Sequence, residues 1–180
     1  LVLNGDIPNH SGDIKNFNAI CEIAAGVTGG HCPCVFARGN HDTRGIHAED
    51  MPYYIPTMNG NTYYTFRLGG LWGILMDCGE DKPDSDMEYG GTAAYDAYRE
   101  SMAQWLAETI ESEEYKSAPV KIVLMHIPFE EKAGWWGNNE LKRLLLPLLN
   151  KADVDLMMSG HTHRYSFREK GTSGGNEFPI

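Results

Sequence analysis

The sequence predicts an α/β fold, in which short buried strands alternate with amphipathic helices. Short apolar runs recur along the chain, apolar residues at helical spacing fill several of the intervals, and polar residues directly follow the runs. A chain of 180 residues can bury a substantial core and is the usual size of one domain. We therefore expect a single domain over residues 1–180, truncated at both ends.

The composition favours a globular protein and disfavours two classes of partner. Hydrophobic residues make up 42% of the chain, which is ordinary for a folded domain. The formal net charge is -10, with 25 acidic residues against 15 basic ones. Nucleic acid, and with it a nuclease activity, is disfavoured because its phosphates would be repelled. The apolar runs are too short to cross a membrane, so we expect no membrane partner.

The cysteines leave the cellular compartment open. Cys32 and Cys34 are too close along the chain for an easy disulfide, and no zinc-binding spacing completes the group. His31 beside them makes a metal site conceivable, but free or structural thiols are the simpler interpretation. The chain begins at Leu1, inside an apolar run, so the absence of a signal peptide says little. The cytoplasm is our working expectation for the compartment.

The first part of the chain predicts two parallel strands joined by a helix. Residues 1–3 and 34–37 are the apolar runs, and helical spacing predicts a helix over about 13–25, which glycines then end. Parallel strands bring the loops at their carboxyl ends to one edge of a sheet. We therefore expect Asp6 and Asn40, which follow these strands, to lie on the same rim.

The later elements are predicted from the same patterns. Apolar stripes indicate helices over about 92–115 and around 141–149, and Pro147 should kink or divide the second one. A Gly-Gly turn joins two of the remaining strands into a β-hairpin. Those strands are predicted over 62–68, 71–77, 120–125, 154–158 and, as a short strand, 164–169.

Potential metal ligands follow four of the predicted strands. They are Asp6, Asn40, His126, His161 and His163. One histidine in such a place is most simply a structural residue, but repetition at four strand ends indicates a common site. Carboxylate, amide and imidazole groups together suit Mn, Fe or Zn. The last two histidines would share a face in an extended backbone, or point at two neighbouring ions from a tight turn.

These residues resemble the successive motifs of the calcineurin-like metallophosphoesterases. The motifs are Gly5-Asp6, Gly39-Asn40-His41-Asp42, His126 after an apolar strand, and Gly160-His161-Thr162-His163. The resemblance implies a metallophosphoesterase-type α/β sandwich, with two mixed β-sheets flanked by helices. It also implies an enzyme that hydrolyses small phosphomonoesters or phosphodiesters, with two transition-metal ions (Mn, Fe or Zn) and a metal-bridging hydroxide as the nucleophile.

The resemblance also implies a role for each metal ligand. Asp6 would bridge the two metals. Asn40, His126 and His161 would complete the second metal, and His163 would belong to the first.

The same resemblance makes His41 the proton donor or transition-state stabiliser, oriented by Asp42. One departure concerns the first metal, because similar proteins begin with an Asp-x-His motif on an earlier strand and nothing precedes Leu1 here. We therefore expect this segment to bind one metal or none and to be poorly active, although the intact protein would use two. A catalytically impaired binding module with the same fold is the alternative.

Four further residues are candidates for substrate binding. Arg44 could hold a phosphate oxygen or form a surface ion pair, and His10 could face the site or only solvent. Trp135 and Trp136 could stack on a ring of the substrate, or simply pack. No tyrosine occurs over residues 7–9, which disfavours the tyrosine-ligated iron of purple acid phosphatases. Exposed sheet edges in a truncated domain would also allow self-association.

Overall fold

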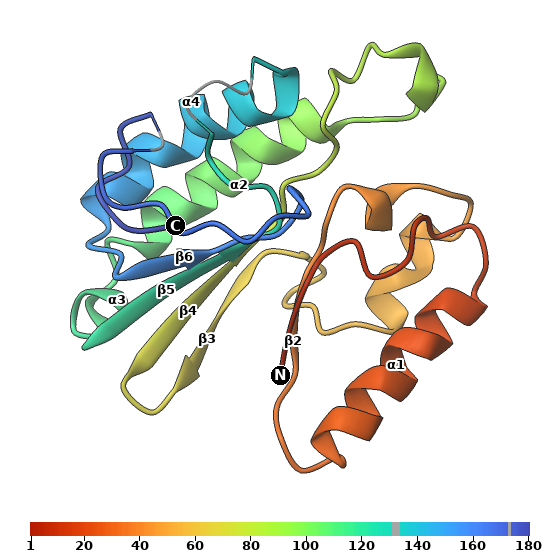
Figure 1. The fold of residues 1–180 in the computed structure, drawn as a ribbon, viewed down its shortest axis with the longest axis horizontal. Helices are drawn as coiled ribbons and strands as arrows, with labels where there is room; N and C mark the ends of the chain where they lie inside the picture. The colour runs from red at the N-terminus through yellow and green to blue at the C-terminus, as the bar shows by residue number, and fades with distance from the viewer. Residues whose placement is uncertain (131–133, 173) are drawn as a thin grey trace.

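Two β-sheets lie face to face, and helices cover their outer faces (Figure 1). The computed structural model describes residues 1–130, 134–172 and 174–180. A two-stranded sheet has the order β1-β2, and a four-stranded sheet has the order β3-β4-β5-β6. The α/β sandwich predicted from the sequence is therefore confirmed.

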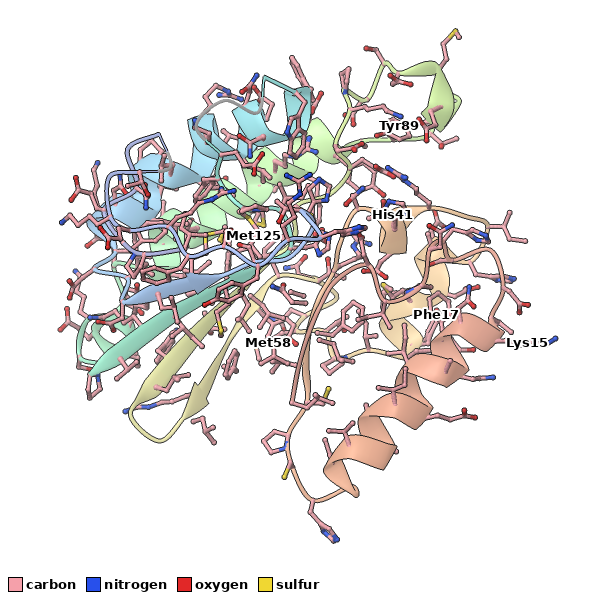
Figure 2. The ribbon with its side chains drawn as sticks, viewed as in Figure 1. Lys15, Phe17, His41, Met58, Tyr89 and Met125 are labelled. Carbon is pink, nitrogen blue, oxygen red and sulfur yellow. The ribbon has the colours of Figure 1, made fainter. Side chains whose placement is uncertain are left out.

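The two-stranded sheet is parallel and carries helix α1. β1 (Val2–Asn4) pairs with β2 (Val35–Ala37), and α1 spans Lys15–Thr28. Phe17 is fully buried against Phe36 of β2 because apolar residues recur on one face of α1. Figure 2 shows Phe17 on the side of α1 that faces the rest of the chain, whereas Lys15 points away from it.

The four-stranded sheet is mixed. Its hairpin is antiparallel and its other two pairings are parallel. Side chains alternate between its faces, as a strand requires: Val123 and Met125 of β5 pack against the helices, while Leu124 faces β2 in the other sheet. The strands are β3 (Tyr64–Leu68), β4 (Leu71–Met76), β5 (Val120–Met125) and β6 (Leu156–Met158). The expectation of self-association through exposed edges stays a prediction, and β3 is one of those edges.

Two long helices cover the outer face of this sheet. α2 spans Tyr95–Thr109, and α4 spans Trp136–Lys151 with Pro147 inside it. The predicted helix over 92–115 is wrong at both ends. It begins later, and it is interrupted after Thr109 because Ser112 starts a separate helix, α3 (Glu113–Lys116), by accepting the Tyr115 N–H on its Oγ.

Two smaller corrections concern the later part of the chain. The helix predicted around 141–149 begins earlier, at Trp136. The predicted strand over 164–169 is absent from that described segment, although Arg168 and Ile180 exchange two backbone hydrogen bonds. No helix in the described ranges is long and apolar enough to cross a membrane. The described structure also contains three short 3₁₀ helices: η1 (His41–Thr43), η2 (Ala48–Tyr53) and η3 (Met87–Tyr89).

Candidate metal centre

Three predicted ligands from distant parts of the chain converge at one edge of the sandwich. Asp6 follows β1, His126 follows β5, and His161 lies in the loop after β6. One ligand atom from each lies within 4.8 Å of the others. The three residues line a cavity of ≈ 610 Å³. The parallel strands explain the convergence, because their carboxyl ends meet at one edge.

The ring of His126 is oriented as a metal-binding histidine usually is. Its Nδ1 lies 2.7 Å from the carbonyl oxygen of Asn4, so Nδ1 carries the proton and donates it. Nε2 then presents a lone pair toward Asp6 Oδ2, 2.9 Å away. Apart from this ion-pair contact, this buried nitrogen has no hydrogen bond to the described residues. A cation between the two atoms would satisfy both, so the residues fit a metal ion.

Without a metal, the same contact couples the two titrations. Burial alone would lower the pKa of His126, but the contact with Asp6 and its charge outweigh burial and raise the pKa. Burial alone would raise the pKa of Asp6, and the contact with His126 lowers it. Each group therefore favours the charged form of the other. A metal ion would take the place of the His126 Nε2 proton, beside the charged carboxylate of Asp6.

Asn40 belongs to the same cluster through its amide oxygen. Asn40 Oδ1 lies 3.1 Å from Nδ1 of His161, and Asn40 is buried at the start of η1. The ring of Trp135 covers His161, with the ring centroids 5.5 Å apart. Burial, followed by the charge of His126, lowers the pKa of His161. The neutral imidazole that a metal requires is thereby favoured.

The backbone at this edge is held in unusual conformations. Asp6, His161 and His163 have φ values of 52°, 65° and 53°, in the left-handed region that costs side-chain-bearing residues energy. Such strain concentrates at functional sites. Close packing requires glycine at position 39, because a Cβ there would lie 2.4 Å from Asp6 Oδ1.

His41 lies where the two parts of the molecule meet (Figure 2). Its Nδ1 is 2.8 Å from the carbonyl oxygen of Asn9, so that nitrogen is the donor, and Nε2 faces Arg44 NH1 at 3.5 Å. The prediction that Asp42 orients this ring is wrong for the described structure. Asp42 Oδ2 instead accepts the backbone N–H groups of Asp6 and Gly39, at 2.7 and 2.8 Å.

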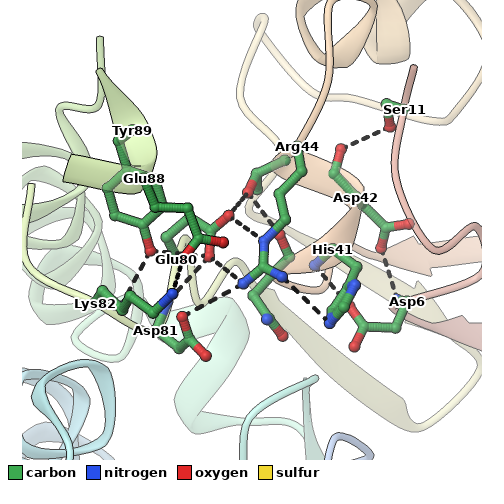
Figure 3. A network of polar contacts seen from close by, with 12 residues as sticks. Asp6, Ser11, His41, Asp42, Arg44, Glu80, Asp81, Lys82, Glu88 and Tyr89 are labelled. Carbon is green, nitrogen blue, oxygen red and sulfur yellow. Dashed lines mark hydrogen bonds and ion pairs between the residues drawn. The ribbon is translucent and has the colours of Figure 1, made fainter. Parts of the chain in front are cut away.

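Asp42 therefore joins the first two motif loops through the backbone. Its side chain is buried, and burial raises its pKa to about 6. Ser11 donates its hydroxyl to the Asp42 carbonyl oxygen, as Figure 3 shows beside the contact with Asp6. A carboxylate that holds two loops in register is a positioning group, since it touches neither the ring of His41 nor the cluster ligands' side chains among the described hydrogen bonds.

The other predicted residues are less closely associated with the cluster. His163 lines the same cavity but is exposed and lies outside the group of three ligand atoms. His10 is exposed, and its Nδ1 accepts the Gly12 N–H in a local turn. Trp136 Nε1 donates to Asp96 at 3.0 Å, away from His161. Arg44 pairs with Glu80 at 2.7 Å, as the ion-pair alternative predicted.

Three contributors were missed by the sequence analysis. Asn4 and Asn9 accept hydrogen bonds on their backbone carbonyl oxygens, so their side chains give no indication of this role. Glu80 lies among several acidic residues in an irregular loop, so no spacing distinguishes it. Its only signal is its place shortly after β4, at the same sheet edge as the other motifs.

Known proteins similar to this chain identify its family. The pattern of the calcineurin-like phosphoesterase family matches residues 1–165. Purple acid phosphatase 18 of Arabidopsis thaliana is 26% identical over 160 residues, which cover 82% of this chain and 33% of that protein. Probable purple acid phosphatase 20 of the same plant is 26% identical over 149 residues, covering 74% and 32%. The chain spans about a third of the length of these curated relatives. The family match includes every ligand gathered at the sheet edge, and the chain belongs to the calcineurin-like phosphoesterase family.

Proposed function

We propose that this chain is the metal-binding catalytic region of a hydrolase of small phosphomonoesters or phosphodiesters. The observation that carries the proposal is the Nε2 atom of His126. It is buried, its ring is fixed by Asn4, and it lies 2.9 Å from Asp6 Oδ2. The family match and the phosphatase relatives support the same chemistry.

One ion fits the gathered ligands. Asp6, Asn40, His126 and His161 would hold it, whereas the exposed His163 would need further ligands to hold a second one. Zn, Mn or Fe suits this mixture of carboxylate, amide and imidazole. When bound, such ions supply an activated water as nucleophile and positive charge for the phosphoryl oxygens.

The chain's own residues would act on the leaving-group side. His41 Nδ1–H donates a hydrogen bond to the Asn9 carbonyl oxygen. Nε2 is therefore the atom that can carry a proton and deliver it to the leaving oxygen. Arg44 NH1 lies 3.5 Å from that atom and can donate to it while it is unprotonated; once Nε2 carries a proton, NH1 would donate to an oxygen of the phosphoester. Trp135, against His161, would cover the ligands and exclude water. No tyrosine occurs over residues 7–9, so we do not extend a tyrosine-ligated iron to this chain.

The test combines metal stoichiometry with turnover. Wild-type protein should bind about one Zn²⁺ per chain by calorimetry and elemental analysis, and then hydrolyse para-nitrophenyl phosphate or its bis-ester. His126→Ala should abolish both properties. His31→Ala is the matched control, because this histidine is exposed and lies before β2, away from the cluster. Wild-type protein that binds zinc at His126 but turns over neither ester would contradict the proposed hydrolysis.

A catalytically impaired binding module remains the second candidate. The observation that favours it is the position of His163, which is exposed and outside the cluster. This candidate predicts zinc binding without turnover of any phosphoester. It also predicts that His41→Ala changes no measurable property of the site, because His41 contributes no ligand atom to the cluster.

A further inference from the structure

The carboxylate of Glu80 is the most heavily hydrogen-bonded side chain next to the candidate site. It lies in the acidic loop after β4 and is only 1% exposed. Figure 3 shows the group between the chain around η1 and the loop that carries η3. Five donors reach it: Arg44 Nε at 2.7 Å, Arg44 NH2 at 2.9 Å, Thr43 Oγ1 at 3.1 Å, Tyr89 OH at 3.1 Å and Asp81 N at 3.3 Å.

This carboxylate fixes the plane and direction of the Arg44 guanidinium. Two parallel hydrogen bonds use Nε and NH2, which is the bidentate geometry that arginine forms with carboxylates. The third nitrogen, NH1, is left for other partners, and its one hydrogen bond in the described structure is to His41 Nε2, at 3.5 Å. The pair therefore aims a charged donor at the catalytic histidine's reactive nitrogen.

Glu80 is buried and Arg44 is partly exposed, as expected if Glu80 holds Arg44 in place and Arg44 donates to a ligand. The Glu80 side chain is 2% exposed, whereas that of Arg44 is 25% exposed. Both residues line a cavity of ≈ 740 Å³. Burial alone would raise the pKa of Glu80, but Arg44 outweighs it and the pKa is lowered, so the carboxylate stays charged at neutral pH. The exposed part of Arg44 can thus meet a ligand, and the cavity that it lines is distinct from the one lined by the metal ligands.

We propose that Glu80 is a positioning residue, which holds Arg44 so that NH1 donates to an oxygen of a phosphoester bound beside His41. The inference rests on the proposed function, because the phosphoester is the ligand that Arg44 would meet. Glu80 itself touches no substrate. Glu80 would affect phosphoester binding only by orienting the Arg44 guanidinium. A carboxylate that merely stabilised the loop against η1 would affect binding whether or not Arg44 was present.

A double-mutant cycle on phosphate affinity tests that dependence. Inorganic phosphate is titrated calorimetrically into the Zn²⁺-loaded protein, with zinc content measured for each variant. Glu80→Gln should weaken phosphate binding about tenfold, because the amide cannot accept both guanidinium bonds. Arg44→Lys should weaken phosphate binding at least as much, since lysine lacks the planar pair of N–H donors that arginine presents to Glu80. Adding Glu80→Gln to Arg44→Lys should then change the affinity less than twofold.

Two further variants test whether Glu80 acts by orienting Arg44 or by stabilising the acidic loop. Glu88→Gln breaks an exposed ion pair with Lys82 in the same loop and should leave phosphate affinity unchanged. Tyr89→Phe removes one of the five donors but keeps the Arg44 fork, so its effect should be below threefold. The Arg44 Nε–H signal in an NMR spectrum, assigned by its loss in Arg44→Lys, should be sharp in wild type and broadened or lost in Glu80→Gln.

The results distinguish this inference from the proposed hydrolysis. Wild-type protein that binds phosphate but turns over no aryl phosphate contradicts the hydrolysis, and the affinity cycle still decides the role of Glu80. Equal effects of Glu80→Gln in the wild-type and Arg44→Lys backgrounds would overturn the inference. So would a zinc-loaded wild-type protein that binds no phosphate, or a Glu80→Gln protein that binds it normally.

Discussion

His41 is held at one ring nitrogen and open at the other. The Asn9 carbonyl oxygen accepts a hydrogen bond from His41 Nδ1–H, and Nε2 lies beside Arg44. No ligand atom of the three-residue cluster comes from His41. If His41 is the proton donor, its role can therefore be measured independently of metal binding.

Replacing His41 by alanine should therefore lower turnover far more than metal content. General acid catalysis contributes on the order of 10²- to 10⁴-fold, so we expect kcat for an aryl phosphate to fall by at least about 100-fold. Zinc per chain, measured by elemental analysis, should stay at the wild-type value. His10→Ala is the control, because its ring serves only a local turn with Gly12 among the described contacts. Stoichiometric loss of zinc in His41→Ala would rule out the role.

Gly39 offers a second test at the scale of one residue. A Cβ there would lie 2.4 Å from Asp6 Oδ1 and 2.6 Å from Asp6 N, and backbone cannot yield as a flexible side chain can. Gly39→Ala should displace Asp6 and weaken zinc affinity at least tenfold by calorimetry. Gly26→Ala is the matched control, since nothing lies within 4 Å of its Cβ position in α1 and alanine favours a helix. Equal zinc affinities in the two variants would contradict the steric explanation.

Side chains that follow strands were predictable, and partners reached through the backbone were not. Asp6 and His126 stand at strand ends, where the topology brings ligands together. Asn9 orients His41 through a carbonyl oxygen, which every residue possesses, so its sequence carries no signal. The family resemblance assigned this role to Asp42, but adjacent side chains on a 3₁₀ turn point in different directions.

At the scale of elements, a buried ion pair fastens the end of β4 to the strand before the His41 loop. Asp77 is 0% exposed and lies 2.6 Å from Arg38 NH2. It also accepts from Thr62 Oγ1 at 2.5 Å and from the Gly79 N–H at 2.9 Å. The carboxylate thus joins the chain after β2, the entrance to β3 and the acidic loop.

Asp77→Asn should destabilise the fold without removing a metal ligand. Removing one partner of a buried pair leaves the other charge uncompensated, at a cost of about 3 kcal/mol. Urea unfolding followed by circular dichroism should show that loss, with zinc stoichiometry unchanged in the folded protein. Glu111→Gln is the control, because it breaks the exposed ion pair with Lys116 and should leave the urea midpoint unchanged. A wild-type midpoint for Asp77→Asn would show that Arg38 finds another partner.

The boundaries of elements depended on contacts that a sequence pattern does not carry. α2 begins at Tyr95 because Asp84, in the preceding loop, accepts the N–H groups of Tyr95 and Asp96 at 2.8 and 3.1 Å. The apolar stripe alone extends the helix to Thr92. By contrast, β5 was predicted correctly, because an apolar run bounded by proline and histidine leaves little choice.

At the scale of the molecule, the cluster lies across the junction of the two sheets. Asp6 and Asn40 come from loops of the two-stranded sheet, and His126 and His161 from loops of the four-stranded sheet (Figure 1). Polar contacts already join the sheets near this edge, among them Asn4 Nδ2 with the Met158 carbonyl oxygen at 3.1 Å and Arg38 with Asp77. A cation bound here would therefore tie the two sheets together.

Zinc should consequently raise the stability of the whole fold and not only order the site. A ligand that binds only the folded state stabilises it by RT ln(1 + [L]/Kd), about 2.7 kcal/mol at a concentration of 100 Kd. For a chain of 180 residues, each kcal/mol shifts Tm by about 2–4 °C. We therefore expect differential scanning calorimetry to record an increase of about 5–10 °C in wild-type protein.

His126→Ala should abolish this increase, because it removes a ligand from the four-stranded sheet, while His31→Ala should retain it. The comparison uses each variant's own metal-free Tm as the baseline, since the loss of the His126 ring lowers stability by itself. A zinc-dependent increase of the same size in His126→Ala would mean that the ion binds elsewhere, for example near the cysteines of the 31–34 segment. The ion would then have no part in holding the two sheets together.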